Sequence, residues 1–396
     1  MVKPMLASSS RFALFSNGFR PFFLGGAIWA MVAMLLWIAL LTGQVDFASH
    51  YGAVAWHAHE FLFGYGSAIV VGFMLTTIPN WTGRLPVNGT PLLALFAVWV
   101  AGRIAMLSAD IIGFLAAAII DSLFLFGMSA AVWREVIAGR NWRNLKMALI
   151  LTVLALANIA FHTEVHLFGQ PIYSIRATTS LLAILIMLIG GRIVPSFTRN
   201  WLAKRQSQPL PTPFNAFDRY SLGFAGGSLG IWTAFPDRAI TATALILGAL
   251  LQTIRLARWE GLRCWREPLV LILHVGYAFI PLGFVAVGIS TLWPQAMPPA
   301  TALHTWTVGA VGVMTLAIMT RTIRAHSGRS LTSPPTTTAI YLLAVLSVIL
   351  RLATVILADW AMVLLELAAI AWVATFLAFI MLYGPMLLWM PMRREG

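Results

Sequence analysis

Long apolar runs recur from one end of this chain to the other, and many reach about 18 residues or more. A helix needs about 20 such residues to cross the hydrocarbon core of a bilayer, whereas a membrane-spanning strand shows about ten in alternation. Of the 396 residues, 60% are hydrophobic and only 10% are charged, against about 25% charged in an ordinary soluble domain. The sequence therefore predicts an all-α, polytopic integral membrane protein, with residues 1–396 in one transmembrane domain.

Charged and Gly/Pro-rich points divide the chain into about twelve expected transmembrane helices. These spans cover residues 22–42, 55–79, 91–107, 111–133, 147–168, 177–197, 219–235, 239–257, 269–292, 301–322, 336–357 and 361–389.

The 26 lysines and arginines predict the orientation of these spans. Most of them fall in loops on one side of the membrane, and only Arg176 and Arg238 fall in loops on the other. Cytoplasmic loops carry the excess of positive charge, so both termini are expected in the cytoplasm. The net charge of +13 therefore serves topology, and no nucleic-acid partner is expected.

The chain has a single cysteine, Cys264. That excludes a CxxCH attachment site for covalent haem, a thiolate-ligated iron–sulfur cluster and an intrachain disulfide. The N-terminus has no apolar stretch before the first long helix, so we expect no cleavable signal peptide.

The sequence also contains an internal repeat. Shifting the second expected span by 245 positions aligns it with the tenth, which places His59 on His304. At nearly the same shift Arg103 falls on Arg351, and the sixth span aligns more weakly. This predicts three four-helix units, at approximately 1–140, 141–260 and 261–396, around a pseudo-threefold axis. The predicted arrangement resembles the first subunit of haem–copper oxidases; chance similarity between glycine-rich helices is the alternative explanation.

Histidines and carboxylates gather in one layer, at the periplasmic ends of the predicted spans. Ionisable side chains within spans are rare and point to function, and imidazole is the usual protein ligand for haem iron, copper and zinc. Taken singly, each histidine can instead simply hydrogen-bond to lipid headgroups or a loop. The layer comprises His57, His59, Glu60, His162, Glu164, His166 and His304.

Helical spacing suggests how these residues pair. His57 and His59 are about 200° apart on a helix and should serve different contacts, whereas His162 and His166, four apart, can chelate one metal ion. His59 and His304, related by the repeat, are expected to face each other across a haem, with His57 as a further cofactor or metal ligand.

The two repeat-related arginines have two alternative roles. Arg103 and Arg351 can pair with haem propionates, or they can neutralise Glu60 or Asp110.

Several motifs resemble the NnrS family. They lie at residues 19–24, "FRPFFL"; 56–84, beginning "WHAHEFLFGYG"; 190–201, "GGRIVPSFTRNW"; 273–283, "LHVGYAFIPLG"; and 303–329, ending "RTIRAHSGR". The resemblance implies a multi-pass protein of the bacterial inner membrane that contains non-covalent, b-type haem and also copper. It further implies a role in denitrification and in protection against nitric oxide. Five histidines lie within the matching motifs, and the resemblance implies that they bind cofactors: His57, His59, His274, His304 and His326.

These observations favour redox chemistry on nitric oxide at a histidine-ligated metal, an oxidoreductase activity like that of a nitric oxide reductase. Glu60 and Glu164 are then candidate proton carriers, and a quinol or another redox partner supplies electrons. Nitric oxide is apolar, so it reaches such a site through the membrane lipids. A proton-coupled transporter is one alternative, because twelve spans with internal repeats also describe many carriers. A sensor that binds nitric oxide or metal without turnover is another.

Overall fold

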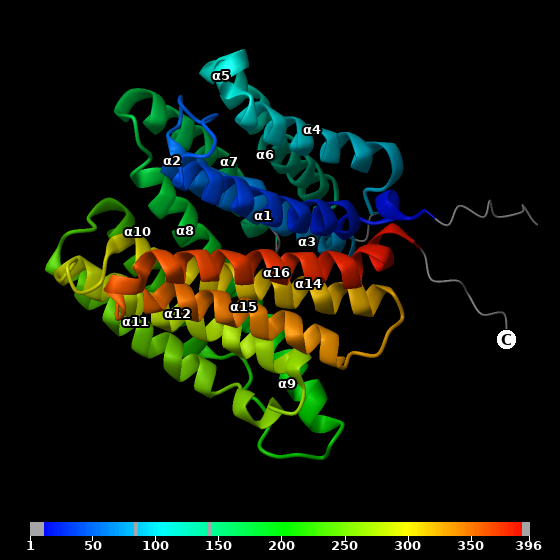
Figure 1. Cartoon of the computed structure of the whole chain (residues 1–396). Coiled ribbons are helices and arrows are strands. Elements are labelled where there is room, and N and C mark those ends of the chain that lie inside the picture. The colour runs from blue at the N-terminus through cyan, green and yellow to red at the C-terminus, as the bar shows by residue number, and fades with distance from the viewer. Residues whose placement is uncertain (1–11, 83–85, 141, 143–144, 390–396) are drawn as a thin grey trace, which may run out of the picture.

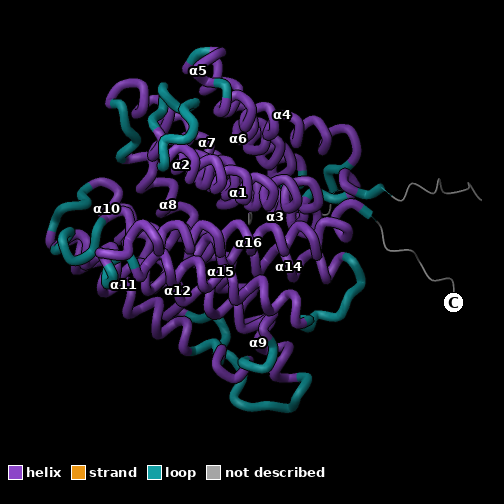
Figure 2. Tube along the Cα trace, in the orientation of Figure 1, coloured by secondary structure: helices purple, strands orange, loops and turns teal. Residues whose placement is uncertain are grey.

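The computed structural model describes residues 12–82, 86–140, 142 and 145–389, and the regular elements in these ranges are all helices joined by short loops (Figures 1 and 2). The α-helices are α1 (Phe19–Leu41), α2 (Ala53–His59), α3 (Ser67–Thr82), α4 (Gly89–Leu107), α5 (Ala109–Ile112), α6 (Phe114–Ala138), α7 (Leu145–Phe168), α8 (Tyr173–Leu185), α9 (Gly191–Ala203), α10 (Ala216–Ala234), α11 (Ala239–Ala257), α12 (Pro268–Leu292), α13 (Pro299–His304), α14 (Val313–His326), α15 (Pro335–Ala353) and α16 (Ala361–Leu388).

Within the described ranges, eleven helical segments are long and apolar enough to cross a membrane, which confirms a polytopic all-helical protein. They coincide with eleven of the twelve expected spans. The remaining one, predicted at 219–235, forms helix α10. This helix contains four glycines together with Asp218 and Arg219, and these residues lower its mean hydropathy below that of the other spans.

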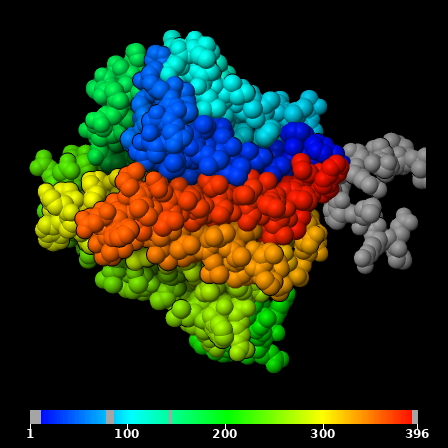
Figure 3. All heavy atoms as spheres, viewed as in Figure 1, coloured from blue at the N-terminus to red at the C-terminus, as the bar shows by residue number. Residues whose placement is uncertain are grey.

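The two described ends of the chain meet at one end of the bundle. Phe12 and Trp389 form an antiparallel bridge, and the guanidinium of Arg20 donates a hydrogen bond of 2.9 Å to the carbonyl of Leu387. Helices α1 and α16 lie side by side along the bundle (Figure 3). The two ends of a chain lie on the same side of a membrane only if the chain crosses it an even number of times. With α10 added to the eleven segments the number of crossings is twelve, so we infer that α10 also crosses the membrane.

The bundle has two packed cores. One lies among α1–α4 and α6–α8 and includes Trp56 and Phe161. The other lies among α8, α10–α12 and α14–α16 and includes Trp306. Apolar side chains such as Leu115 are exposed on the outside of the bundle, as expected for a surface whose solvent is lipid rather than water.

Three of the long helical segments contain a stretch of π-helix. The stretches are η2 (Glu60–Gly66), η4 (Ile186–Gly190) and η6 (Thr305–Gly312). They fall in the second, sixth and tenth expected spans, and η2 and η6 begin at positions that the 245-residue shift aligns. The pseudo-threefold arrangement remains a prediction, and this shared irregularity is consistent with it. A π-helical turn inside an α-helix frequently marks a functional site.

Candidate metal centre and adjoining cavity

A group of polar side chains is buried where the second span meets α4, α6 and α7. His59 is the last residue of α2, and Glu60 begins η2 immediately after it. Both side chains are fully buried, and so, to within a few per cent, are Asp121 of α6 and His162 of α7. Burial of polar groups in an apolar bundle is costly unless each finds a partner, so their contacts decide what the group can do.

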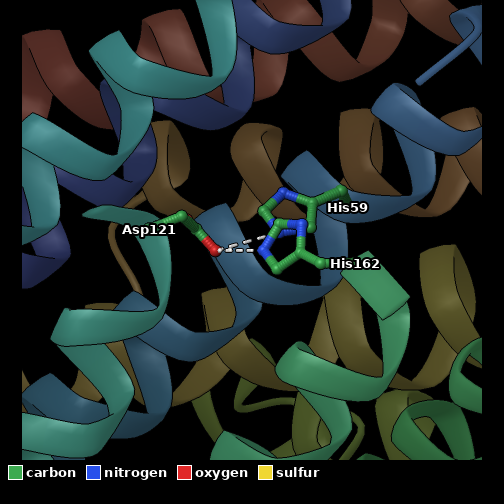
Figure 4. A group of neighbouring side chains, drawn as sticks. All are labelled: His59, Asp121 and His162. Atoms are coloured by element: carbon green, nitrogen blue, oxygen red, sulfur yellow. Dashed lines mark hydrogen bonds and ion pairs between the residues drawn. The ribbon is translucent and has the colours of Figure 1, made fainter. Parts of the chain in front are cut away.

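Two imidazoles face one carboxylate (Figure 4). The Nε2 atoms of His59 and His162 each lie 3.1 Å from Oδ2 of Asp121. Ligand atoms of the three residues all lie within 4.8 Å of one another. Two imidazoles and a carboxylate form a donor set that suits copper, iron or zinc.

The far side of each imidazole is also held. Nδ1 of His59 is 2.9 Å from Oε1 of Glu60, and Nδ1 of His162 is 3.0 Å from the hydroxyl of Tyr51. Metal-binding histidines characteristically use their second ring nitrogen in this way, which fixes the tautomer and the ring orientation. Here both anchors leave Nε2 directed at Asp121.

Asn158 fixes the carboxylate. Its amide Nδ2 donates a 2.7 Å hydrogen bond to Oδ2 of Asp121, and its Oδ1 lies 3.0 Å from Nε2 of His59. Asp121 therefore contacts both imidazoles and Asn158 contacts that of His59, which makes four converging polar side chains in all.

Arg103 balances the negative charge. Its guanidinium lies 2.5 Å from Oε2 of Glu60 and also pairs with Oδ1 of Asp121. Trp29 donates a further hydrogen bond of 2.7 Å to Oε2 of Glu60. Glycine is needed at Gly64 because a Cβ there would lie within 3 Å of the side chains of Arg103, Trp29 and Glu60.

Tyr51 lies just outside the membrane-spanning segment Ala53–Thr77. Burial is the main cause that raises its pKa, and the nearby carboxylates Asp121 and Glu60 raise it further. The phenol therefore stays protonated and remains available as a hydrogen-bond partner for His162.

A second feature, an apolar cavity of about 300 Å³, lies beside this centre, between the second, tenth and last spans. Its lining includes the ionisable residues His57, His304 and Arg351, and its walls include Trp37 and Trp372. Cavities of this size, mainly apolar with a few polar groups, are typical ligand sites.

The two histidines of this cavity are close together. The rings of His57 and His304 have centroids 6.2 Å apart with planes at 17°, and Trp37 stacks on the other side of His57 at 4.3 Å. Nδ1 of His304 is bonded to the carbonyl of Ala300, which leaves Nε2 for another partner. Nδ1 of His57 is buried and has no hydrogen-bond partner among the described residues.

The structure places His57 and His59 in separate sites, as their spacing suggested. Their partners differ from those predicted. His304 lies beside His57 rather than His59, because His59 turns toward α6 and α7. The repeat-related arginines follow the same division. Arg103 contacts the His59 centre, whereas Arg351 lies 3.4 Å from Nδ1 of His304.

His162 takes part in the centre without His166. The ring of His166 stacks on Phe114 with centroids 5.4 Å apart, while His162 turns toward Asp121.

Glu164 lies apart from the centre. It accepts hydrogen bonds from the backbone nitrogens of Ile172 and Ser174 and from the hydroxyl of Ser174, at the start of α8. These contacts give it the role of a helix cap. Asp110, another expected partner for the arginines, instead accepts hydrogen bonds from the backbone of Ser49 and His50.

The two remaining candidate histidines lie elsewhere. His274 is buried and bonded through Nε2 to Thr198 at 2.7 Å. His326 is exposed at the end of α14, and its ring lies 5.0 Å from that of Phe19. Neither contacts the centre or the cavity.

Sequence reasoning missed four members of the centre and its surroundings: Asp121, Asn158, Tyr51 and Trp29. Asp121 carried a usable signal, because an acidic residue inside an apolar span is rare and usually faces the interior of the bundle. Asn158 and Trp29 carry no charge, so their position in an apolar run gave no comparable signal.

No curated protein and no solved structure matches this chain. A family model described as NnrS protein matches residues 13–390, nearly the whole length. The chain therefore belongs to the NnrS family.

Proposed function

We propose that this protein acts in the nitric oxide response as a metal-dependent membrane oxidoreductase, with a redox-active metal at His59, Asp121 and His162. The observation that carries the proposal is the convergence of two imidazole nitrogens on one buried carboxylate oxygen, each 3.1 Å away. Membership of the NnrS family suggests the nitric oxide response, and the donor set suits copper, the metal that the family resemblance implies.

The neighbouring residues prepare the donor atoms. Glu60 and Tyr51 hold the two imidazoles by their Nδ1 atoms, and loss of such an outer partner typically costs 10–100-fold in metal affinity. Arg103 keeps the pair of carboxylates from repelling each other before a cation arrives.

The adjoining cavity fits a haem by the chemistry of its lining. Among the described residues, Nδ1 of His57 is buried without a hydrogen-bond partner, and Nε2 of His304 has none either. Arg351 supplies a cation for a propionate, and the walls of the cavity are apolar and aromatic. Haem supplies one-electron chemistry and a ligand position for nitric oxide; His57 and His304 would hold it, and Arg351 would orient it.

Protons for reduction of nitric oxide can move through the chain's own side chains. Tyr51 and Glu60 hydrogen-bond to Nδ1 of His162 and of His59, the ring nitrogens that the proposed metal does not use. Their hydroxyl and carboxylate groups can accept or donate a proton at these atoms. The bond from Glu60 to His59 supports Glu60, rather than Glu164, as the proton carrier of the proposal, and a quinol or another redox partner would deliver the electrons.

The test is purification in mild detergent, visible spectra of the oxidised and reduced protein, and consumption of nitric oxide under reducing conditions. The proposal expects a Soret band, stoichiometric metal and consumption that His59→Ala abolishes. Binding of nitric oxide without consumption would indicate a sensor instead, and protein free of haem and metal would refute the proposal.

A further inference from the structure

A second large cavity, of about 820 Å³, lies where α3, α7, α9 and α10 approach one another. It lies near the start of α7, whereas His162 lies near the end of that helix. Its lining includes Lys146 of α7, Arg192 and Arg199 of α9, and Asp218 of α10. Apolar residues complete the walls, among them Phe73, Leu188, Ile193, Phe214 and Trp259. The cavity thus combines basic groups with an apolar wall.

The only lining carboxylate, among the described residues, is already neutralised. Asp218 pairs through Oδ1 with Nε of Arg255 at 3.1 Å, and its Oδ2 lies 3.4 Å from Arg258. Its Oδ2 also accepts a hydrogen bond from the backbone of Asn215, which completes the capping box at the start of α10. Asp218 therefore leaves the charge of the other lining residues uncompensated.

Three basic side chains of the lining have no carboxylate partner within 4 Å in the described part of the chain: Lys146, Arg192 and Arg199. Arg199 is held in place, since its guanidinium donates to the carbonyl of Pro211, another residue of the wall.

The arginine that pairs with Asp218 lies behind the wall of the cavity. Arg255 is fully buried, and its Nη2 has no hydrogen-bond partner among the described residues. A Cβ added to Gly191, a lining residue, would lie within 2 Å of this atom, so the guanidinium packs directly against the backbone of the wall. Arg255 neutralises Asp218 from behind the wall, so the positive charges of Lys146, Arg192 and Arg199 remain around one concave space.

We propose that this cavity binds an acidic phospholipid, with the phosphate on Lys146, Arg192 and Arg199 and an acyl chain along the apolar wall. Phosphate is the anion that Arg and Lys hold most readily through charge-assisted hydrogen bonds. Basic pockets between transmembrane helices bind acidic headgroups in the same way. The proposal is independent of the histidine centre and of nitric oxide chemistry.

The experiment is native mass spectrometry of the full chain in non-ionic detergent, with phosphatidylglycerol and phosphatidylcholine of identical acyl chains. The wild-type protein should retain phosphatidylglycerol in preference to phosphatidylcholine. The double variant Lys146→Gln/Arg192→Gln should retain about tenfold less, because each basic group near the headgroup contributes to binding. The matched control, Lys204→Gln/Arg219→Gln, changes two exposed basic residues that do not line the cavity, and should bind as the wild type does.

Unchanged melting temperatures of both double variants would show that the fold is intact. Equal retention of phosphatidylglycerol by the two double variants, or no preference over phosphatidylcholine, would overturn the proposal. Displacement of phosphatidylglycerol by millimolar inorganic phosphate would identify a free phosphate as the occupant and would also overturn the assignment to a lipid.

Discussion

His57 of the second span lies beside His304 of the tenth, with ring centroids 6.2 Å apart and ring planes at 17°. The two rings enter one apolar cavity together with Arg351. His59, two positions from His57, belongs to a different site, because it faces Asp121 and His162. The second span thus contributes one histidine to each of two neighbouring sites.

If the cavity holds haem, His57→Ala and His304→Ala should each lower the haem content of the purified protein, since each removes one imidazole from it. The measurement is the Soret absorbance per polypeptide. His50→Ala is the matched control, because His50 lies in an exposed loop. Full haem content in both cavity variants would place the haem elsewhere.

Arg103→Leu should strongly destabilise the protein. It leaves Glu60 and Asp121 buried without their cation, and removal of one partner from a buried ion pair costs about 3–5 kcal/mol. The comparison is Arg134→Gln. Arg134 pairs with Glu135 but is 69% exposed, so loss of this ion pair should cost less than about 1 kcal/mol. Similar apparent melting temperatures for the two variants would contradict the assigned role of Arg103.

Tyr51→Phe should weaken metal binding by about 10–100-fold while the fold persists, because it removes only the hydroxyl that orients His162. Competition titration with a chelator measures the affinity. Unaltered affinity would mean that His162 is oriented by its other contacts alone.

Glu164→Ala should lower stability without loss of metal. The substitution removes charge-assisted hydrogen bonds to the start of α8, each worth about 1.5–3 kcal/mol. Thermal unfolding and metal analysis of the same sample check both parts. Loss of metal at unchanged stability would show that Glu164 serves the centre and does not cap the helix.

Much of this architecture was predictable from the sequence because lipid imposes simple rules. Apolar length and the distribution of basic residues predicted the spans, with α10 less apolar than expected. The histidine layer also located the region of the sites. What could not be predicted was the rotation of each helix about its own axis, on which the partners of a side chain depend.

The partners of His59 and His162 illustrate this limit. Spacing alone allowed His162 to pair with His166 on one helical face, but the packing of α6 against α7 brings Asp121 to His162 instead. The predicted repeat aligns His59 with His304, yet equivalence under a repeat does not imply contact. The π-helical turn that begins at Glu60, directly after His59, was also not predicted from the sequence.

The central claim is a metal held by His59, Asp121 and His162. The most direct test is the content of copper, iron and zinc per polypeptide, measured by elemental analysis, in the wild type and in His59→Ala, His162→Ala and His166→Ala. The account predicts one metal ion retained by the wild type and by His166→Ala, whose ring stacks on Phe114, and lost from the other two. Equal metal content in all four proteins would contradict it.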